Sequence, residues 1–270
     1  MPIVDEITTK HCRVERDGHV VTLTMNRPEA RNALSPDMLV GLADGFSYVD
    51  DEPAVRVAIL TGAGGTFSSG ADLKAMGTPS DDERVRRRMG EETNLHWKAL
   101  LRERRPTKPM VAAVEGYAVA GGTEMLQGTD IRIAAETAIF GVWEARRALF
   151  PMGGSAVRLP RQIPYTRAMD ILLTARPVTA HEALEIGLIA RVVPEGHALN
   201  VARAVADQVA ACGPLAVQAI LRVWRETEGL SDAEAMDVMD PIGWEVMASE
   251  DAKEGPRAFA EKRPPVFEGQ

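Results

Sequence analysis

Two glutamates, Glu124 and Glu144, have the residue type and the surroundings for proton transfer. Glu124 lies in the run VAGGTEML, and Glu144 follows the run FGVW. Burial in apolar surroundings disfavours the charged form of a carboxyl group, so its pKa rises and it can exchange protons near neutral pH. The sequence leaves structural alternatives open. Glu124 could complement the dipole at a helix start, and Glu144 could pair with Arg146 or Arg147.

The elements that must position these glutamates follow from periodicity and turn residues. The pair Gly121-Gly122 predicts the start of a helix that carries Glu124. Residues 20–25 alternate apolar and polar side chains, which predicts a half-buried strand. Apolar runs predict further strands at residues 55–60, 110–114, 131–134, 138–140 and 188–193.

Capping signals predict where several helices begin. Ser35, followed by proline, is expected to cap a helix whose apolar residues recur at helical spacing. Ser80 with Glu83 and Thr179 with Glu182 have the spacing of capping boxes. Strands and helices alternate up to about residue 198, and only helical patterns follow until the proline-containing tail. The fold class predicted is therefore α/β with a helical C-terminal region.

Composition limits the kinds of partner. The 270 residues carry a formal net charge of −8, which disfavours nucleic acid and anionic membranes as general partners. Neither a secretion signal nor a long apolar span is evident. Cys12 and Cys212 lack metal-ligand spacing, so no metal site is expected, and two distant cysteines fit a reducing cytoplasm.

Glycine-rich stretches and one arginine run invite other interpretations. Gly65 and Gly70 have P-loop spacing, but Ala71 and Asp72 stand where lysine and serine or threonine are needed. A dinucleotide fingerprint starting at Gly62 fails because Phe67 takes the last glycine position. The arginines between 84 and 88 are most simply a solvated helix face.

Five segments together resemble the enoyl-CoA hydratase (crotonase) family, in order and over nearly the whole chain. Any one alone would be weak. The resemblance is to actinobacterial-type enoyl-CoA hydratases. It implies a crotonase-like spiral of repeated strand-strand-helix units over residues 1–198, with a helical region at 199–270 for trimerisation and CoA adenine contact. The segments are NRPEARNAL (26–34), FSSGADL (67–73), GYAVAGGTE (116–124), FGVWE (140–144) and FAEKR (259–263).

The resemblance implies roles for four residues. The amides of Ala71 and Gly121 would form an oxyanion hole for the thioester oxygen, where a helix start favours negative charge. Glu124 would activate a water for attack at the β-carbon of a trans-2-enoyl-CoA, and Glu144 would protonate the α-carbon. The product would be a 3-hydroxyacyl-CoA. Because relatives that isomerise usually keep only one acid, two glutamates favour hydration.

The resemblance also implies a CoA site and an assembly. No cofactor is expected, because coenzyme A is part of the substrate. The protein is expected to form a homotrimer, or a homohexamer built as a dimer of trimers, without nucleic acid or membrane. The residues implied for substrate and CoA binding are Ala30, Arg31, Ala33, Asp72, Leu73, Phe259 and Lys262.

The sequence departs from the family pattern near the second acid. It therefore does not determine which acyl group is bound, and two other functions stay possible. Val142 and Trp143 stand where glutamine and proline commonly precede the second acid, so the pocket wall differs. Four side chains could shape a large apolar pocket for a bulky acyl group such as a steroid side chain, although tryptophan and methionine are more often core: Trp143, Trp97, Met76 and Met89. A Δ3,Δ2-enoyl-CoA isomerase is the main alternative. A non-catalytic or RNA-binding homologue is a weaker one.

Overall fold

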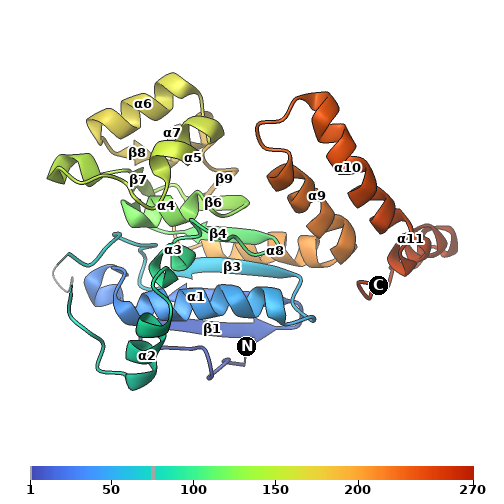
Figure 1. The fold of residues 1–270 in the computed structure, drawn as a ribbon, viewed down its shortest axis with the longest axis horizontal. Helices are drawn as coiled ribbons and strands as arrows, with labels where there is room; N and C mark the ends of the chain where they lie inside the picture. The colour runs from blue at the N-terminus through green and yellow to red at the C-terminus, as the bar shows by residue number, and fades with distance from the viewer. Residues whose placement is uncertain (1, 74–76) are drawn as a thin grey trace.

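The computed structural model describes residues 2–73 and 77–270, so Met76 lies outside the described residues. The larger of its two sheets has the strand order β1-β2-β3-β4-β6-β9 (Figure 1). Only β1 runs antiparallel to its neighbour, and the other four pairings are parallel. The strands are β1 (Cys12–Asp17), β2 (Val20–Met25), β3 (Val57–Gly62), β4 (Met110–Val114), β6 (Ile131–Ala135) and β9 (Arg191–Val193).

A smaller sheet completes the spiral. It consists of β5 (Tyr117–Val119), β7 (Ile139–Gly141) and β8 (Val178–Thr179), in the order β5-β7-β8. The chain passes from β4 in the large sheet to β5 in the small one, then to a helix, and repeats the step with β6 and β7. The crotonase-like spiral is therefore confirmed, although the sequence shows no clear repeat.

Helices cover the sheets and fill the connections (Figure 1). The helices of the first half are η1 (Pro28–Ala30), α1 (Pro36–Asp51), α2 (Glu83–Glu91), α3 (Leu95–Ala99), α4 (Gly121–Leu126) and η2 (Glu144–Arg147). Those of the second half are α5 (Ser155–Gln162), α6 (Tyr165–Thr174), α7 (Ala180–Glu185), α8 (Ala198–Ala210), α9 (Pro214–Glu226), α10 (Asp232–Met247) and α11 (Glu250–Glu261).

The expectation that β2 is half-buried is wrong, since all six of its residues are buried. Val21 and Leu23 pack in the cluster that includes α1, whereas Val20 packs with residues of α8 on the other face. Helices on both faces of a largely parallel sheet bury its strands from both sides.

Two of the three expected caps are found. The side chain of Ser35 accepts from the amide of Met38 at the start of α1, and Thr179 accepts from the amide of Glu182 at α7. The carboxylate of Glu182 pairs with Arg176 instead of the backbone of Thr179, so only half of that expected capping box forms. The capping box of Ser80 is wrong, because Asp82 caps α2 instead. An aspartate directly before the helix can bond its first amides, and Ser80 lies two residues too early.

The C-terminal helices divide by their packing. Helix α8 lies on the large sheet, and its Ala202 and Val205 pack against strand residues such as Ile59. The boundary expected after residue 198 therefore falls at the start of a core helix. Helices α9, α10 and α11 project to one side as an arm (Figure 1).

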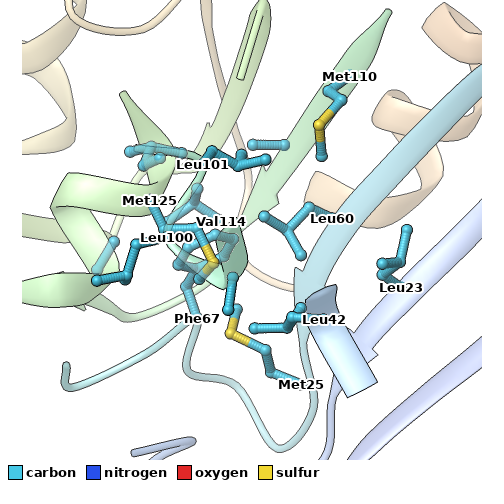
Figure 2. Packing of buried hydrophobic residues seen from close by; sticks show 14 of the residues in the cluster. Leu23, Met25, Leu42, Leu60, Phe67, Leu100, Leu101, Met110, Val114 and Met125 are labelled. Carbon is cyan, nitrogen blue, oxygen red and sulfur yellow. The ribbon is translucent and has the colours of Figure 1, made fainter. Parts of the chain in front are cut away.

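The core brings α4 against both the sheet and the 100–101 segment. Met125, next to Glu124 in the chain, belongs to the same buried cluster as Phe67, Leu100 and Val114 (Figure 2). This packing fixes the helix that carries Glu124.

Among the helices of the described residues, none is by itself long and apolar enough to cross a bilayer. The bent pair α8 and α9 qualifies only by length and composition.

Candidate active site

The carboxyl group of Glu124 is buried at the junction of α4 and α5. Its side chain is on the first turn of α4, with 4% of the residue exposed. Oε1 accepts a hydrogen bond of 3.1 Å from the amide of Ser155, the first residue of α5. A Cβ atom built on Gly153 would lie 2.6 Å from Oε2, so only glycine leaves room for the carboxyl group there.

Two opposing effects set the pKa of Glu124. Burial raises it, because the charged form loses hydration, while the amides of Ser155 and Gly153 and the charge of Arg158 oppose the rise. The net pKa is raised. Glu124 is thus suited to accept a proton from water near neutral pH.

Glu144 begins the short helix η2 and is only partly buried. Its Oε2 atom is inaccessible to solvent and has no hydrogen-bond partner among the described residues. Burial and then the nearby charge of Glu124 raise the pKa of Glu144 to about 7. Two carboxyl groups so close resist joint ionisation, and the pair can hold one proton at neutral pH.

The structural alternatives for the two acids have different outcomes. Glu144 forms no ion pair with Arg146 or Arg147 within the described part of the chain, and Arg146 lies over the ring of Trp143 instead. Glu124 does lie in the first turn of a helix, as its alternative requires, but its carboxyl group contacts the start of α5. A purely electrostatic role at α4 does not account for that contact.

The amides of Ala71 and Gly121 lie close together. A Cβ built on Gly70 would lie 2.9 Å from the amide nitrogen of Gly121, and one built on Gly121 would lie 3.7 Å from that of Ala71. In the described ranges, neither amide donates to a protein acceptor. Ala120 has a φ of 50°, a conformation that costs energy outside glycine and is held here by surrounding packing. The arrangement leaves two neighbouring backbone donors free.

The residues expected at the CoA site divide into two groups. Ala30, Arg31 and Ala33 surround Asn32, which is fully buried and holds their loop to the 63–66 turn. Arg31 is exposed, and its guanidinium lies 6.0 Å from the ring centroid of Tyr117. This loop is therefore rigid at its centre and open at its surface.

Asp72 and Leu73 follow the candidate oxyanion amide of Ala71. Asp72 forms an ion pair of 2.5 Å with Arg27, and Leu73 is 47% exposed. Leu34 pairs with Ala71 in a parallel bridge, which joins the two expected CoA-binding segments. The bridge brings residues from both motifs to one surface.

Phe259 and Lys262 are not brought to this surface within one chain. Both belong to the end of α11, on the opposite side of the molecule from α4 and η2 (Figure 1). Phe259 is 86% exposed. Their expected contact with the adenine end stays a prediction.

The residues expected to shape the acyl pocket also divide. Trp97 and Met89 pack partly buried against the main core cluster, as ordinary core residues do. Trp143 instead forms an edge-to-face contact with Tyr117, with ring centroids 6.3 Å apart. It also lies over Gly141, whose Cβ would meet the indole. Trp143, which precedes Glu144 in the chain, is thus packed against Tyr117 and Gly141.

Three residues that hold the candidate site in place were not predicted from the sequence. Neither Gly153 nor Ser155 was assigned a role from the sequence, yet both contact Glu124. Asn32 was seen only as part of a motif, yet its amide donates to two carbonyls and its Oδ1 accepts from Arg27. Glycine before a helix-starting serine is a usable signal, since such an amide can bind a carboxylate.

The arginine run between 84 and 88 is engaged by its own surroundings. Arg84 donates to backbone carbonyls of the N-terminal segment, and Arg86 to those before α2. Arg88 pairs with Asp44 and Glu92, and Arg87 with Glu91. In the described residues, no group of three or more histidine, cysteine, aspartate or glutamate side chains forms a candidate metal site.

Comparisons with known proteins show which family this chain resembles. Residues 15–270 match the family model described as enoyl-CoA hydratase/isomerase. The chain is 56% identical over 259 residues to the enoyl-CoA hydratase EchA19 of Mycobacterium tuberculosis, covering 95% of this chain and 96% of that protein. It is 35% identical over 258 residues to the (E)-benzylidenesuccinyl-CoA hydratase of Thauera aromatica, covering 95% and 98%.

A solved structure gives the same result for the fold. The crystal structure of an enoyl-CoA hydratase from Mycobacterium tuberculosis superimposes with a TM-score of 0.87 at 39% identity, covering 97% of this chain and 100% of that one. The sequence matches span nearly the full length and include both glutamate-bearing segments. The chain belongs to the enoyl-CoA hydratase/isomerase family.

Proposed function

We propose that this protein hydrates the 2,3 double bond of a trans-2-enoyl-CoA to give a 3-hydroxyacyl-CoA. The observation that carries the proposal is the interaction of Glu124 with Glu144, two acids with raised pKa values in one site. The names of its relatives, an enoyl-CoA hydratase and a benzylidenesuccinyl-CoA hydratase, support the same reaction type.

The geometry suggests how each group contributes. The free amides of Ala71 and Gly121 bind the thioester oxygen and stabilise the negative charge that develops on it. Glu124 removes a proton from water as its oxygen attacks the β-carbon, and Glu144 delivers a proton to the α-carbon. Because the pKa of Glu144 is raised to about 7, Glu144 can donate a proton while Glu124 accepts one.

The substrate is an acyl-CoA, and no separate cofactor is required because the CoA is part of it. We place the CoA against the loop of Ala30, Arg31 and Ala33 and against Asp72 and Leu73. The aromatic contact between Trp143 and Tyr117 favours a substrate with a bulky acyl group, such as an aryl or steroid side chain. We place the reaction in β-oxidation of fatty or bulky acyl groups. Two free cysteines support a cytoplasmic location.

We further propose that the arm of α9, α10 and α11 packs on neighbouring copies to form a trimer or a hexamer. The arm exposes large apolar side chains that a lone chain leaves in water. In such an assembly Phe259 and Lys262 could reach the adenine end of CoA. The exposed side chains are Ile220, Trp224, Trp244, Met247 and Phe259.

An isomerase remains the second candidate because it would use the same oxyanion hole, and the family model carries both names. Proton transfer between carbons needs one acid, whereas adding water benefits from two. RNA binding is disfavoured because the arginine run between 84 and 88 is already engaged within the chain.

The deciding experiment follows the conjugated thioester absorbance after mixing the protein with trans-2-enoyl-CoA substrates that have short, long or aryl chains. Loss of absorbance with formation of a 3-hydroxyacyl-CoA supports hydration. Absorbance gained from a trans-3-enoyl-CoA, without hydration of any 2-enoyl-CoA, would establish the isomerase instead.

A further inference from the structure

The side-chain hydroxyl of Thr123 connects the helix that carries Glu124 to the strand that precedes Glu144. Thr123 belongs to α4, next to Glu124 in the chain, and only 2% of it is exposed. Its Oγ1 accepts a hydrogen bond of 3.2 Å from the amide of Gly141, the last residue of β7. The same hydroxyl donates to the carbonyl of Ala118 in β5, and the carbonyl of Gly141 lies 3.1 Å away. One buried hydroxyl group therefore joins α4, β5 and β7.

Gly141 is held both from α4 and from the segment that leads to Glu144. The amide of Ala120, directly before α4, donates to the carbonyl of Gly141 at 2.8 Å. The indole of Trp143 occupies the place where a Cβ of Gly141 would stand, so a larger residue at 141 would overlap Nε1. Because only two residues separate Gly141 from Glu144, a shift of Gly141 would displace Glu144 relative to Glu124.

The same contacts hold the backbone before the candidate oxyanion amide of Gly121. Ala120 has a φ of 50° and a ψ of −127°, a combination that costs energy outside glycine and persists only where the surroundings enforce it. The hydrogen bond from Ala120 to Gly141 is one such constraint, and Thr123 binds Gly141 at its amide. Loss of the hydroxyl would loosen Gly141 and allow Ala120 to relax, which would turn the amide of Gly121.

We propose that Thr123 is a positioning residue, whose hydroxyl sets the two carboxyl groups and the candidate oxyanion amide relative to one another. The role rests on the proposed hydration. Thr123 exchanges no proton with the substrate, because its hydroxyl is bonded to the backbone of two strands. Hydrogen bonds are directional, so they fix an orientation that apolar packing alone leaves free. Thr123 therefore acts on the reaction through Gly141.

Thr129 offers a matched control for the loss of a buried hydroxyl. It is also 2% exposed, and its Oγ1 donates to the carbonyl of Leu126 at 2.7 Å. This bond lies within the turn that follows α4 and joins residues only three positions apart. Thr129→Val thus removes a hydroxyl of equal burial without loosening the contact between α4 and β7.

The first measurement is the turnover of a trans-2-enoyl-CoA by variants of Thr123. Thr123→Val keeps the branched shape but lacks the hydroxyl, and its kcat should fall about 100-fold, as expected for a displacement of about 1 Å in the catalytic groups. KM should change little, because Thr123 is not in the segments that we place against CoA. Thr123→Ser keeps the hydroxyl and should retain most of the rate, as should Thr129→Val.

The second measurement needs no turnover. NMR titration of isotope-labelled glutamate side chains gives the pKa of Glu144, with Glu144→Gln to identify its signal. In Thr123→Val this pKa should fall from about 7 toward the ordinary value of 4.5, because separation of the two segments reduces the burial and the charge of Glu124 that raise it. In Thr123→Ser and Thr129→Val it should stay at about 7.

The proposal is overturned if Thr123→Val retains either the rate or the pKa of Glu144, since the acids would then keep their places. It is also overturned if Thr123→Ser or Thr129→Val loses as much as Thr123→Val, because the effect would be one of packing. Should Thr123→Val not fold, Thr123→Ser and Thr123→Ala differ by the same hydroxyl and decide the question.

A failure of the proposed hydration gives a different result. If the unmodified protein hydrates no enoyl-CoA, that function is rejected, and the pKa of Glu144 alone then decides whether Thr123 sets the two acids. A fall of this pKa confined to the variants without the hydroxyl supports the positioning role in either case.

Discussion

Gly153 lies against the carboxyl group of Glu124, so that a Cβ on Gly153 would come within 2.6 Å of Oε2 and 2.8 Å of Cδ. Gly153→Ala should therefore displace Glu124 without touching its chemistry. A displacement of about 1 Å in a catalytic group can reduce the rate about 100-fold. Turnover of a trans-2-enoyl-CoA should fall accordingly, while circular dichroism stays unchanged.

Gly90→Ala, on α2, is the control, because a Cβ there meets nothing within 4 Å. Its turnover should equal that of the unmodified protein. Full activity of Gly153→Ala would show that the carboxyl group of Glu124 can move freely, and that its buried position has no role in the rate.

Replacing either acid with glutamine separates chemistry from folding. Glu124→Gln and Glu144→Gln keep volume and most hydrogen bonds but remove proton transfer, so each should reduce the rate about 10²–10⁴-fold. Since the two acids act as a unit, the double variant should lose much less than the product of the single losses. Stopped-flow rates and melting temperatures measure both effects. Near-full hydration by Glu144→Gln would make Glu144 a structural residue.

The raised pKa of Glu144 predicts two dependences on pH. As a proton donor with a pKa of about 7, it should make kcat/KM fall as pH rises through 7. Stability should change in the same direction. From the ordinary value of 4.5 up to 7, the folded state holds the proton more tightly than the unfolded state, so the free energy of unfolding decreases as pH rises.

Denaturant unfolding at pH 5 and pH 8 checks the sign. The unmodified protein should lose stability relative to Glu144→Gln between these two values. If the free energies of unfolding of the two proteins differ by the same amount at pH 5 and at pH 8, Glu144 titrates normally in the folded state.

Asn32 links the expected CoA loop to the glycine-rich turn after β3. Its Nδ2 donates to the carbonyls of Ala63 and Thr66 at 2.9 and 2.6 Å, and its φ is 52°. Asn32→Ala leaves two partly buried carbonyls unpaired, which should cost about 1 kcal/mol, and should also raise KM for acyl-CoA as Arg31 loses its support. Chemical denaturation and steady-state kinetics measure the two effects. Unchanged KM would separate this loop from CoA binding.

The exposed arm predicts self-association. Trp244, 71% exposed on α10, should be covered in the proposed trimer. Trp244→Glu should then reduce the mass measured by light scattering at micromolar concentration, because a charge would be buried in the contact. A monomeric mass for the unmodified protein would reject the assembly. An unchanged oligomer in Trp244→Glu would place the contact elsewhere on the chain.

Local patterns determined much of the fold and part of the candidate site. Alternating and apolar runs located the strands β2, β4 and β6. Ser35, Gly121 and Thr179 located the starts of α1, α4 and α7. These signals could be read from the sequence because each depends on a few neighbouring residues. The local sequence also singled out the two glutamates, whereas the oxyanion role expected for Gly121 came from the family resemblance. The capping of α2 was misassigned because Ser80 lies two residues before the cap position, which Asp82 occupies.

Tertiary structure alone decided which of these residues meet. The spiral brings Glu124 of α4 to Gly153 and Ser155, some 30 positions later, and sets Glu144 beside it. It also buries both faces of β2. Sequence patterns report the neighbours along the chain, whereas burial, raised pKa values and shared charge depend on neighbours across it.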